Sequence, residues 1–268
     1  MPPSRFDHLA GIYQRYRPAY PPELLAGLRD WVIGSAPAGD EVLVVDVGAG
    51  TGIATRLLRT TFGDGPRIIG LEPSASMRAE AVAHTPPALA IEFCDGHAER
   101  LPLGARSVRA VVAAQAAHWF DRPRFYAECA RVLEPGGVLA LLYNNRRWEG
   151  HPLLEAFERY LEAHSPGYTR GYRAFPFGRE LAEAGFDVPA PLRVEWRRAV
   201  RRDEFVGMSL SSTKTDAVVQ RLGRPAVERD LVALVEAHGG GDPLEIPYVS
   251  EAILGLQRGE RRSAARER

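Results

Sequence analysis

The sequence has no excess of charge of either sign, since 34 Lys and Arg residues are matched by 34 Asp and Glu residues in 268 positions. A balanced chain creates no field that would draw it to the phosphates of nucleic acid or to an anionic membrane surface. We therefore expect neither of these partners. The hydrophobic content of 45% is enough for a large core, which is typical of a soluble globular enzyme.

Cysteine and long apolar runs are also scarce. The only cysteines, Cys94 and Cys129, form no CxxC pair and no Cys/His cluster with the spacing of metal ligands. We expect two buried thiols in a reducing compartment, with no disulfide and no metal site. The amino terminus has no apolar stretch of signal-peptide length, and no run approaches a membrane span. The sequence therefore predicts a cytoplasmic protein with no membrane attachment.

A glycine-rich stretch follows the first strongly apolar segment. Residues 42–47 are almost all β-branched or aliphatic, which is typical of a strand covered on both faces of a parallel sheet. Three alternating glycines then allow a tight turn along which a ligand can lie directly against the backbone, namely Gly48, Gly50 and Gly52. Apolar residues at helical spacing follow over 51–61. Strand, glycine turn and helix together predict a nucleotide-type site.

Strands and helices continue to alternate over about the next hundred residues. Further strands are expected at 66–71, 88–93 and 108–114, and a fifth, buried strand at 138–143, with helical segments between them. This alternation predicts an α/β protein with a doubly wound, Rossmann-like sheet. Later in the chain, 192–200 has the alternating pattern of a half-exposed strand near the sheet edge, and 244–256 is expected to be the last strand.

Acidic residues end two of these strands. Glu72 follows the second strand, twenty positions after Gly52, where a carboxylate could accept hydrogen bonds from both hydroxyls of a ribose. Asp95 follows the third strand and could reach the edge of a base beside that ribose. An Asx turn at Asp95-Gly96 explains this second acid equally well.

The spacing of the glycines narrows the choice of ligand. A dinucleotide fingerprint places its third glycine three positions after the second, where this chain has Ile53, and the turn has no phosphate-loop lysine. Acid-x-Gly-x-Gly-x-Gly instead resembles the first motif of class I S-adenosylmethionine-dependent methyltransferases. Three further motifs resemble those of the same family, in the family's order, at Gly70–Ser74, Asp95–Pro102 and Arg131–Gly137.

Two other segments resemble a narrower group. Tyr13–Pro21 and Gln115–Phe120 are similar to the trans-aconitate methyltransferase-like small-molecule subgroup with a methyltransferase type 11 domain. The resemblance implies S-adenosyl-L-methionine as cofactor. It also implies a seven-stranded, mostly parallel sheet with an antiparallel strand near the C-terminus and a helical cap.

The resemblance assigns most of the cofactor-binding residues. The turn would pass under the methionine part of the cofactor, Asp46 would orient its ammonium group through the turn, and Glu72 with Pro73 would hold the ribose. For Asp46, a purely structural role is an equal alternative. Tyr13 would close over the sulfonium as part of a lid. The residues expected along the methionine part are Gly48, Ala49, Gly50 and Gly52. Those expected beside the adenine are Asp95, Gly96, His97 and Ala98, and Gln115 is expected near the methionyl end.

His118 is the candidate general base, because it follows the fourth strand and imidazole titrates near neutral pH. The alternative is a histidine that only shapes the pocket beside Trp119. If the acceptor is a carboxylate, no base is needed and an arginine could bind the acid, although solvation at the surface is the commoner fate of such side chains. The substrate-side candidates are Trp119, Tyr143, Asn145, Arg146, Arg170 and Arg173.

These inferences predict a single methyltransferase domain over 1–268. Its expected parts are an N-terminal lid and first helix (5–40), a cofactor-binding core (41–143), substrate-side cap segments (144–180 and 200–243) and a flexible tail (258–268). The expected reaction (EC 2.1.1.-) is methyl transfer to a small molecule, at an oxygen of a carboxylate or hydroxyl group, by a monomer or homodimer. A nicotinamide-dependent oxidoreductase and a non-catalytic cofactor-binding module are the alternatives.

Overall fold

The computed structural model describes residues 18–34 and 41–258, except for the side chains of residues 172 and 173. Within these ranges lies one seven-stranded sheet with the order β3-β2-β1-β4-β5-β7-β6. The strands are β1 (Leu43–Val47), β2 (Arg67–Leu71), β3 (Glu92–Cys94), β4 (Val108–Ala114), β5 (Leu133–Arg146), β6 (Leu192–Val200) and β7 (Leu244–Leu256). The predicted lid residue Tyr13 and the tail from 259 lie outside the described residues.

The first five strands are parallel, and β7 runs antiparallel to both of its neighbours, β5 and β6. The predicted fold class is therefore confirmed, including the antiparallel strand near the C-terminus and the half-exposed strand at the edge. All of the parallel strands end at one edge of the sheet, where the turns after β1, β2 and β4 meet.

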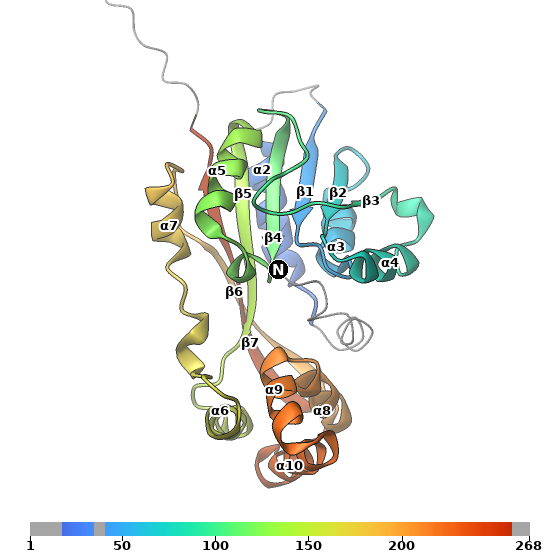
Figure 1. The fold of residues 1–268 in the computed structure, drawn as a ribbon, viewed down its shortest axis with the longest axis vertical. Coiled ribbons are helices and arrows are strands. Elements are labelled where there is room, and N and C mark those ends of the chain that lie inside the picture. Colours follow the sequence, from blue (N-terminus) through green and yellow to red (C-terminus); the bar gives the residue numbers. More distant parts are fainter. Residues whose placement is uncertain (1–17, 35–40, 259–268) are drawn as a thin grey trace, which may run out of the picture.

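Helices cover both faces of this sheet (Figure 1). Helices α2 (Pro22–Gly34) and α3 (Ile53–Phe62) pack against one face, and α5 (Arg122–Val132) and α7 (Phe177–Glu183) against the other. The short helix α4 (Ala75–Ala83) contacts β3. Because the central strands are covered twice, their residues are apolar on both faces, as in the fully buried Ala110–Ala113 segment of β4.

Four more helices form a separate layer beyond one end of the sheet (Figure 1). These are α6 (Pro152–His164), α8 (Arg202–Leu210), α9 (Thr213–Leu222) and α10 (Arg224–His238). Their buried faces share a third apolar core with the end of β6 and the start of β7, through Val200, Leu244 and Ile246. Because β5 leads through Arg146 to α6, this helical cap lies beyond the carboxyl ends of the parallel strands.

Two local predictions were wrong. Residues 87–89 form the 3₁₀ turn η3 (Pro87–Leu89) instead of the start of the third strand, because two consecutive prolines remove backbone donors and Ala90 has a positive φ of 47°. Cys94 is exposed, because β3 is an edge strand and Cys94 is its last residue; Cys129 is buried as predicted.

Residues 165–178, which showed no regular period in the sequence, contain the 3₁₀ turn η5 (Arg170–Arg173) and the start of α7.

Candidate functional site

The turn after β1 is built on three glycines with positive φ angles: 72° at Gly48, 56° at Gly50 and 77° at Gly52. Side chains are excluded at two of them, since a Cβ at Gly48 would lie 2.8 Å from the Cβ of Ala116, and one at Gly52 would lie 2.7 Å from the ring of Phe93. A Cβ at Gly50 would meet nothing within 4 Å. The turn is therefore packed from below and beside, and is open above its middle glycine.

Glu72 joins the tip of β2 to this turn. Its Oε2 accepts a hydrogen bond from the backbone N–H of Gly50 at 3.0 Å, and its Oε1 accepts one from the backbone N–H of Ser74 at 2.9 Å. Burial raises the pKa of Glu72, and these two hydrogen bonds oppose the rise. Each carboxylate oxygen has two lone pairs, so both can accept a further hydrogen bond, as a pair of ribose hydroxyls would require.

Asp46 lies beneath the turn and is fully buried. Its Oδ2 accepts a hydrogen bond from Thr55 Oγ1 of α3 at 2.6 Å, while its Oδ1 has no hydrogen-bond partner among the described residues. Burial raises the pKa of Asp46 to about 7, although the Thr55 hydroxyl opposes the rise. The carboxyl group thus connects β1 to α3 across the turn, and one of its oxygens remains available to a further donor.

Arg78 of α4 connects the ends of β2 and β3. Its Nη1 donates to the backbone oxygen of Glu72 at 2.6 Å and to Asp95 Oδ1 at 2.9 Å. The side chain of Asp95 is 66% exposed, so it faces solvent beside this ion pair. Sequence reasoning missed Arg78, because an arginine on the exposed face of a helix is an ordinary solvated residue until the fold places it against two strand ends.

The other residues predicted for the cofactor surround the same edge of the sheet. Gly96 and Ala98 are buried, whereas His97 is exposed and forms an isolated bridge with Arg100. Gln115, at the tip of β4, has a positive φ of 53° and donates from Nε2 to the backbone oxygen of Asn144 at 2.9 Å. A positive φ in a non-glycine residue stores strain, which is typical of a turn held in place for a function.

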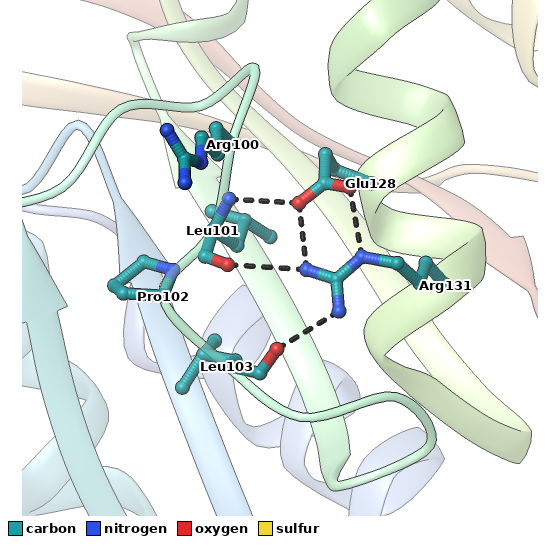
Figure 2. Close-up of a pocket in the computed structure, with 6 residues that line it drawn as sticks. All are labelled: Arg100, Leu101, Pro102, Leu103, Glu128 and Arg131. Carbon is teal, nitrogen blue, oxygen red and sulfur yellow. Dashed lines mark hydrogen bonds and ion pairs between the residues drawn. The ribbon is translucent and has the colours of Figure 1, made fainter.

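A side chain that the sequence did not identify fixes the loop after β3 (Figure 2). Arg131 of α5 donates to the backbone oxygens of Leu101 and Leu103 at 3.1 and 2.9 Å. Glu128, one turn earlier on the helix, accepts from the backbone N–H of Leu101 at 2.8 Å and forms an ion pair with Arg131 at 2.7 Å. We call this pair and its three backbone partners the loop clamp. It lines a pocket of about 610 Å³.

His118 lies in the 3₁₀ turn η4 (Ala117–Trp119), within a group of five rings that we call the aromatic cluster: His118, Trp119, Tyr143, Phe175 and Phe177. The His118 ring is 5.0 Å from that of Trp119, 6.3 Å from that of Tyr143 and 6.1 Å from that of Phe175. Tyr143 and Phe177 stack at 4.9 Å. Three of the predicted residues, His118, Trp119 and Tyr143, are therefore brought together.

An ion pair between Arg122 and Glu180 packs beside the aromatic cluster. Arg122 of α5 donates to both carboxylate oxygens of Glu180 of α7, at 2.8 and 3.0 Å, and the Tyr126 hydroxyl donates to the same carboxylate at 2.9 Å. The guanidinium of Arg122 lies 5.3 Å from the ring centre of Phe175 and 5.8 Å from that of Phe177. This contact fixes the segment 175–177 against the other rings.

The other substrate-side candidates lie elsewhere. Asn145, Arg146 and Arg170 line a second pocket, of about 460 Å³, between the end of β5 and the edge strands. The Arg146 guanidinium lies 4.9 Å from the ring centre of Phe157 in the cap. Arg170 forms a two-point ion pair with Glu162, and its guanidinium lies 4.8 Å from the ring centre of Trp148. The side chain of Arg173 is not among those described.

Comparison with known proteins identifies the core. Residues 45–141 match the family described as a methyltransferase domain. An uncharacterized methyltransferase of Mycobacterium tuberculosis is 40% identical over 142 residues, which are 53% of this chain and 52% of that protein. A malonyl-[acyl-carrier protein] O-methyltransferase of Methylococcus capsulatus is 37% identical over 118 residues, which are 44% of this chain and 40% of that protein. The chain thus spans about half the length of the curated relatives first matched.

Solved structures agree over a longer stretch. The structure of a proposed type II methyltransferase from Anaeromyxobacter dehalogenans is 26% identical, with a TM-score of 0.64 over 91% of this chain and 98% of that one. The YcgJ protein of Bacillus subtilis shares the fold, with a TM-score of 0.53 and 20% identity over 88% of this chain and 98% of that one. The fold is Rossmann-like, and residues 45–141 are similar to a methyltransferase domain.

The residues at the carboxyl ends of the parallel strands fit S-adenosylmethionine, the cofactor that the family match implies. Space is open above Gly50, the Glu72 oxygens have lone pairs to spare, and the buried Asp46 Oδ1 has no partner among the described residues. Among the described residues no group of His, Cys, Asp and Glu side chains could hold a metal ion. None of the described helices has the length and apolar character needed to cross a bilayer.

Proposed function

We propose that this protein is a methyltransferase that uses S-adenosylmethionine to methylate an oxygen atom of a small-molecule acceptor. The observation that carries the proposal is the contact between Glu72 and the open glycine turn, at 3.0 Å from Oε2 to the backbone nitrogen of Gly50. It brings a hydrogen-bonded carboxylate and an unobstructed backbone to the same edge of the sheet. The O-methyltransferase from Methylococcus capsulatus, although it matches only 44% of this chain, supports oxygen as the acceptor atom.

S-Adenosylmethionine supplies, when bound, an electrophilic methyl group on a positively charged sulfur. The protein would then act mainly by positioning and by excluding water, because in-line displacement needs no nucleophilic side chain. In this proposal the glycine turn holds the methionine part, Glu72 accepts the ribose hydroxyls, and Asp46 orients the ammonium group through the turn. His118 takes a proton from a hydroxyl acceptor, and the residues around Gly96 and Ala98 flank the adenine.

Isothermal titration calorimetry with S-adenosylhomocysteine tests the cofactor assignment. We expect micromolar affinity for the wild-type protein and a loss of about tenfold to a hundredfold in Glu72→Ala, since hydrogen bonds to a charged group contribute about 1.5–3 kcal/mol. Glu92→Ala is the matched control, because Glu92 is an exposed acid on the neighbouring strand that pairs with Arg67. Absence of binding at millimolar ligand would refute the proposal.

Labelled methyl donor separates catalysis from binding alone. Transfer of label to any component of a metabolite extract, read by mass spectrometry, is expected for an enzyme and not for a non-catalytic cofactor-binding module. His118→Ala should lower turnover more than it lowers cofactor affinity. An equal loss of both would place His118 in the cofactor pocket. Binding of reduced nicotinamide dinucleotide, measured by quenching of protein fluorescence, would favour the oxidoreductase alternative instead.

A further inference from the structure

We propose that the methyl acceptor is a small planar molecule with a weakly acidic hydroxyl group, of the phenol or enol type, which stacks on the aromatic cluster and accepts a hydrogen bond from Tyr143. This inference rests on the proposed function and makes it more specific. It selects the hydroxyl over the carboxylate, and it assigns Tyr143 the role of binding and orienting the acceptor oxygen while His118 receives the proton.

The aromatic cluster lies next to the glycine turn. The segment that carries His118 packs directly on the glycine turn, because a Cβ at Gly48 would lie 2.8 Å from the Cβ of Ala116 and 3.0 Å from the ring of Phe120. His118 lies between these two residues in the sequence. The aromatic cluster is therefore the group of side chains that adjoins the proposed methionine end of the cofactor site.

The surface of the cluster is aromatic. His118, Trp119 and Phe175 are each half-buried, so they present ring surface at this edge of the sheet. The rings of His118 and Phe175 are nearly parallel, with an interplanar angle of 24°. Aromatic surfaces bind flat, apolar molecules by offset stacking, which an extended aliphatic acid cannot use.

The Tyr143 hydroxyl is a buried donor beside these rings. Tyr143 is 7% exposed, and its O–H donates to no acceptor among the described residues. Burial raises the pKa of Tyr143 well above its ordinary value, although the Arg122 charge opposes the rise. The group therefore stays protonated and acts as a donor. A buried donor without an acceptor is costly, and an acceptor oxygen from a substrate would remove that cost.

The charge beside the cluster is neutralised. Arg122, whose guanidinium lies over the rings of Phe175 and Phe177, makes a two-point contact with Glu180. A carboxylate acceptor at the aromatic cluster would have to displace Glu180 from Arg122, whereas a neutral hydroxyl has no such requirement.

The chemical balance is simple. The acceptor hydroxyl gives its proton to the imidazole of His118, and the same oxygen forms the new bond to the methyl carbon. The electron pair of the broken carbon–sulfur bond stays on sulfur, which becomes a neutral thioether. Tyr143 keeps its proton throughout and stabilises the negative charge that develops on the acceptor oxygen.

Binding and transfer with two probe classes test this inference. The hydroxyl probes are 7-hydroxycoumarin and 4-nitrophenol, and the carboxylate probes are benzoate and tricarballylate. Each is titrated into the full chain with S-adenosylhomocysteine present, and Trp119 lies close enough to the proposed site to report binding by fluorescence. We expect binding and methylation of the hydroxyl probes at micromolar to millimolar concentration, and at least tenfold weaker binding of the carboxylates.

Tyr143→Phe provides the specific test, with Tyr160→Phe as control because the Tyr160 hydroxyl donates to Asp230 in the cap. Loss of one hydrogen bond should weaken binding of 7-hydroxycoumarin about tenfold. Affinity for S-adenosylhomocysteine should remain within about twofold in both variants, because neither hydroxyl belongs to the proposed cofactor site. Removal of an unpartnered hydroxyl should not lower the melting temperature, so a loss of binding would not reflect unfolding.

The possible results separate the two proposals. If S-adenosylhomocysteine binds but only the carboxylates are bound or methylated, the present inference is wrong and the methyltransferase proposal stands. Unchanged affinity of Tyr143→Phe for 7-hydroxycoumarin, or no binding of either hydroxyl probe, also overturns it. If S-adenosylhomocysteine itself does not bind, the proposed function fails first.

Discussion

Glu72 and Gly50 form the contact that closes the edge of the sheet, with the backbone N–H of Gly50 donating to Glu72 Oε2 at 3.0 Å. The two residues come from turns after neighbouring parallel strands, and Val47 of β1 lies opposite Leu71 of β2 in the register. A left-handed backbone at Gly50 turns its N–H toward the acid, so the carboxylate is fixed before any ligand arrives. Preorganisation of this kind lowers the cost of binding.

Gly50→Ala should separate folding from ligand binding. At φ 56°, with nothing within 4 Å of the new Cβ, the substitution should cost only about 1 kcal/mol of folding free energy. The methyl group would, however, occupy the space proposed for the cofactor. Calorimetry should show loss of S-adenosylhomocysteine binding by at least about tenfold. Gly150→Ala is the control, since it has φ 73° and equally open space but lies between β5 and α6, away from the glycine turn; an equal loss there would contradict the prediction.

Asp46 should make stability depend on pH. Its pKa is about 7 in the folded protein, against 3.8 for the ordinary group. The folded state therefore keeps a proton that the unfolded chain releases, so this group lowers stability as the pH rises from about 4 to about 7, and the loss is constant above that range. Asp46→Asn should be more stable than wild type at pH 8, by up to about 4 kcal/mol, and this difference should shrink as the pH falls toward 4.

Thermal or urea unfolding at pH 5, 6, 7 and 8 measures this effect. Thr55→Val is a useful comparison, because the Thr55 hydroxyl opposes the rise in the pKa of Asp46. Its loss should raise that pKa further, so that stability continues to fall to a higher pH and the total loss is larger. A stability difference between Asp46→Asn and wild type that does not change with pH would mean that the carboxyl group is already ionised in the folded protein.

The parts of the site that the sequence predicted are those set by short stretches of chain. Residues 41–52 contain the strand, the turn and the helix start in one segment, so apolar pattern and glycine spacing define their structure locally. The same holds for the acid at the end of β2. Because all parallel strands end at one edge, the glycine turn and Glu72 could be placed together without knowledge of any long-range contact.

The parts that the sequence did not predict depend on contacts between distant residues. Arg122 and Glu180 are 58 positions apart, and each is an ordinary helix-surface residue by its local pattern. The assembly of the aromatic cluster likewise requires segment 175–177 to return to the end of β4. Two of the arginines predicted for substrate binding, Arg146 and Arg170, line the second pocket, and Arg170 pairs there with Glu162, a contact that local pattern does not predict.

The loop clamp leads to a prediction about cofactor binding. Without Arg131, the backbone oxygens of Leu101 and Leu103 lose their donors, and Glu128 loses its ion-pair partner. The loop that leads back to Ala98 should become mobile, so Arg131→Ala should weaken S-adenosylhomocysteine binding about fivefold to tenfold and lower stability by about 1–3 kcal/mol. Hydrogen exchange over 96–103 should accelerate.

Arg124→Ala is the control for this variant. Arg124 is on the same helix, and its side chain is 76% exposed in a contact of 3.5 Å with Asp121. Exposed pairs of this kind contribute little to stability, so exchange in the loop and ligand affinity should match wild type. Faster exchange in both variants would indicate that α5 as a whole has been loosened and that the clamp has no special role.

The contact between Arg122 and Glu180 should affect the acceptor and not the cofactor. Burial alone would raise the pKa of Glu180, but hydrogen bonds from Arg122 and Tyr126 lower it overall, so the group is held as a carboxylate. Glu180→Gln keeps the shape of the side chain but weakens its hold on Arg122, which in turn fixes the rings of Phe175 and Phe177. The KM for a hydroxyl acceptor should therefore rise about fivefold or more, with S-adenosylhomocysteine affinity unchanged.

Glu183→Gln is the control for this variant. Glu183 lies one turn further along α7 in an exposed pair with Arg179, so its substitution should change neither quantity. Parallel losses of acceptor and cofactor affinity in Glu180→Gln would show that this ion pair supports the whole sheet edge instead.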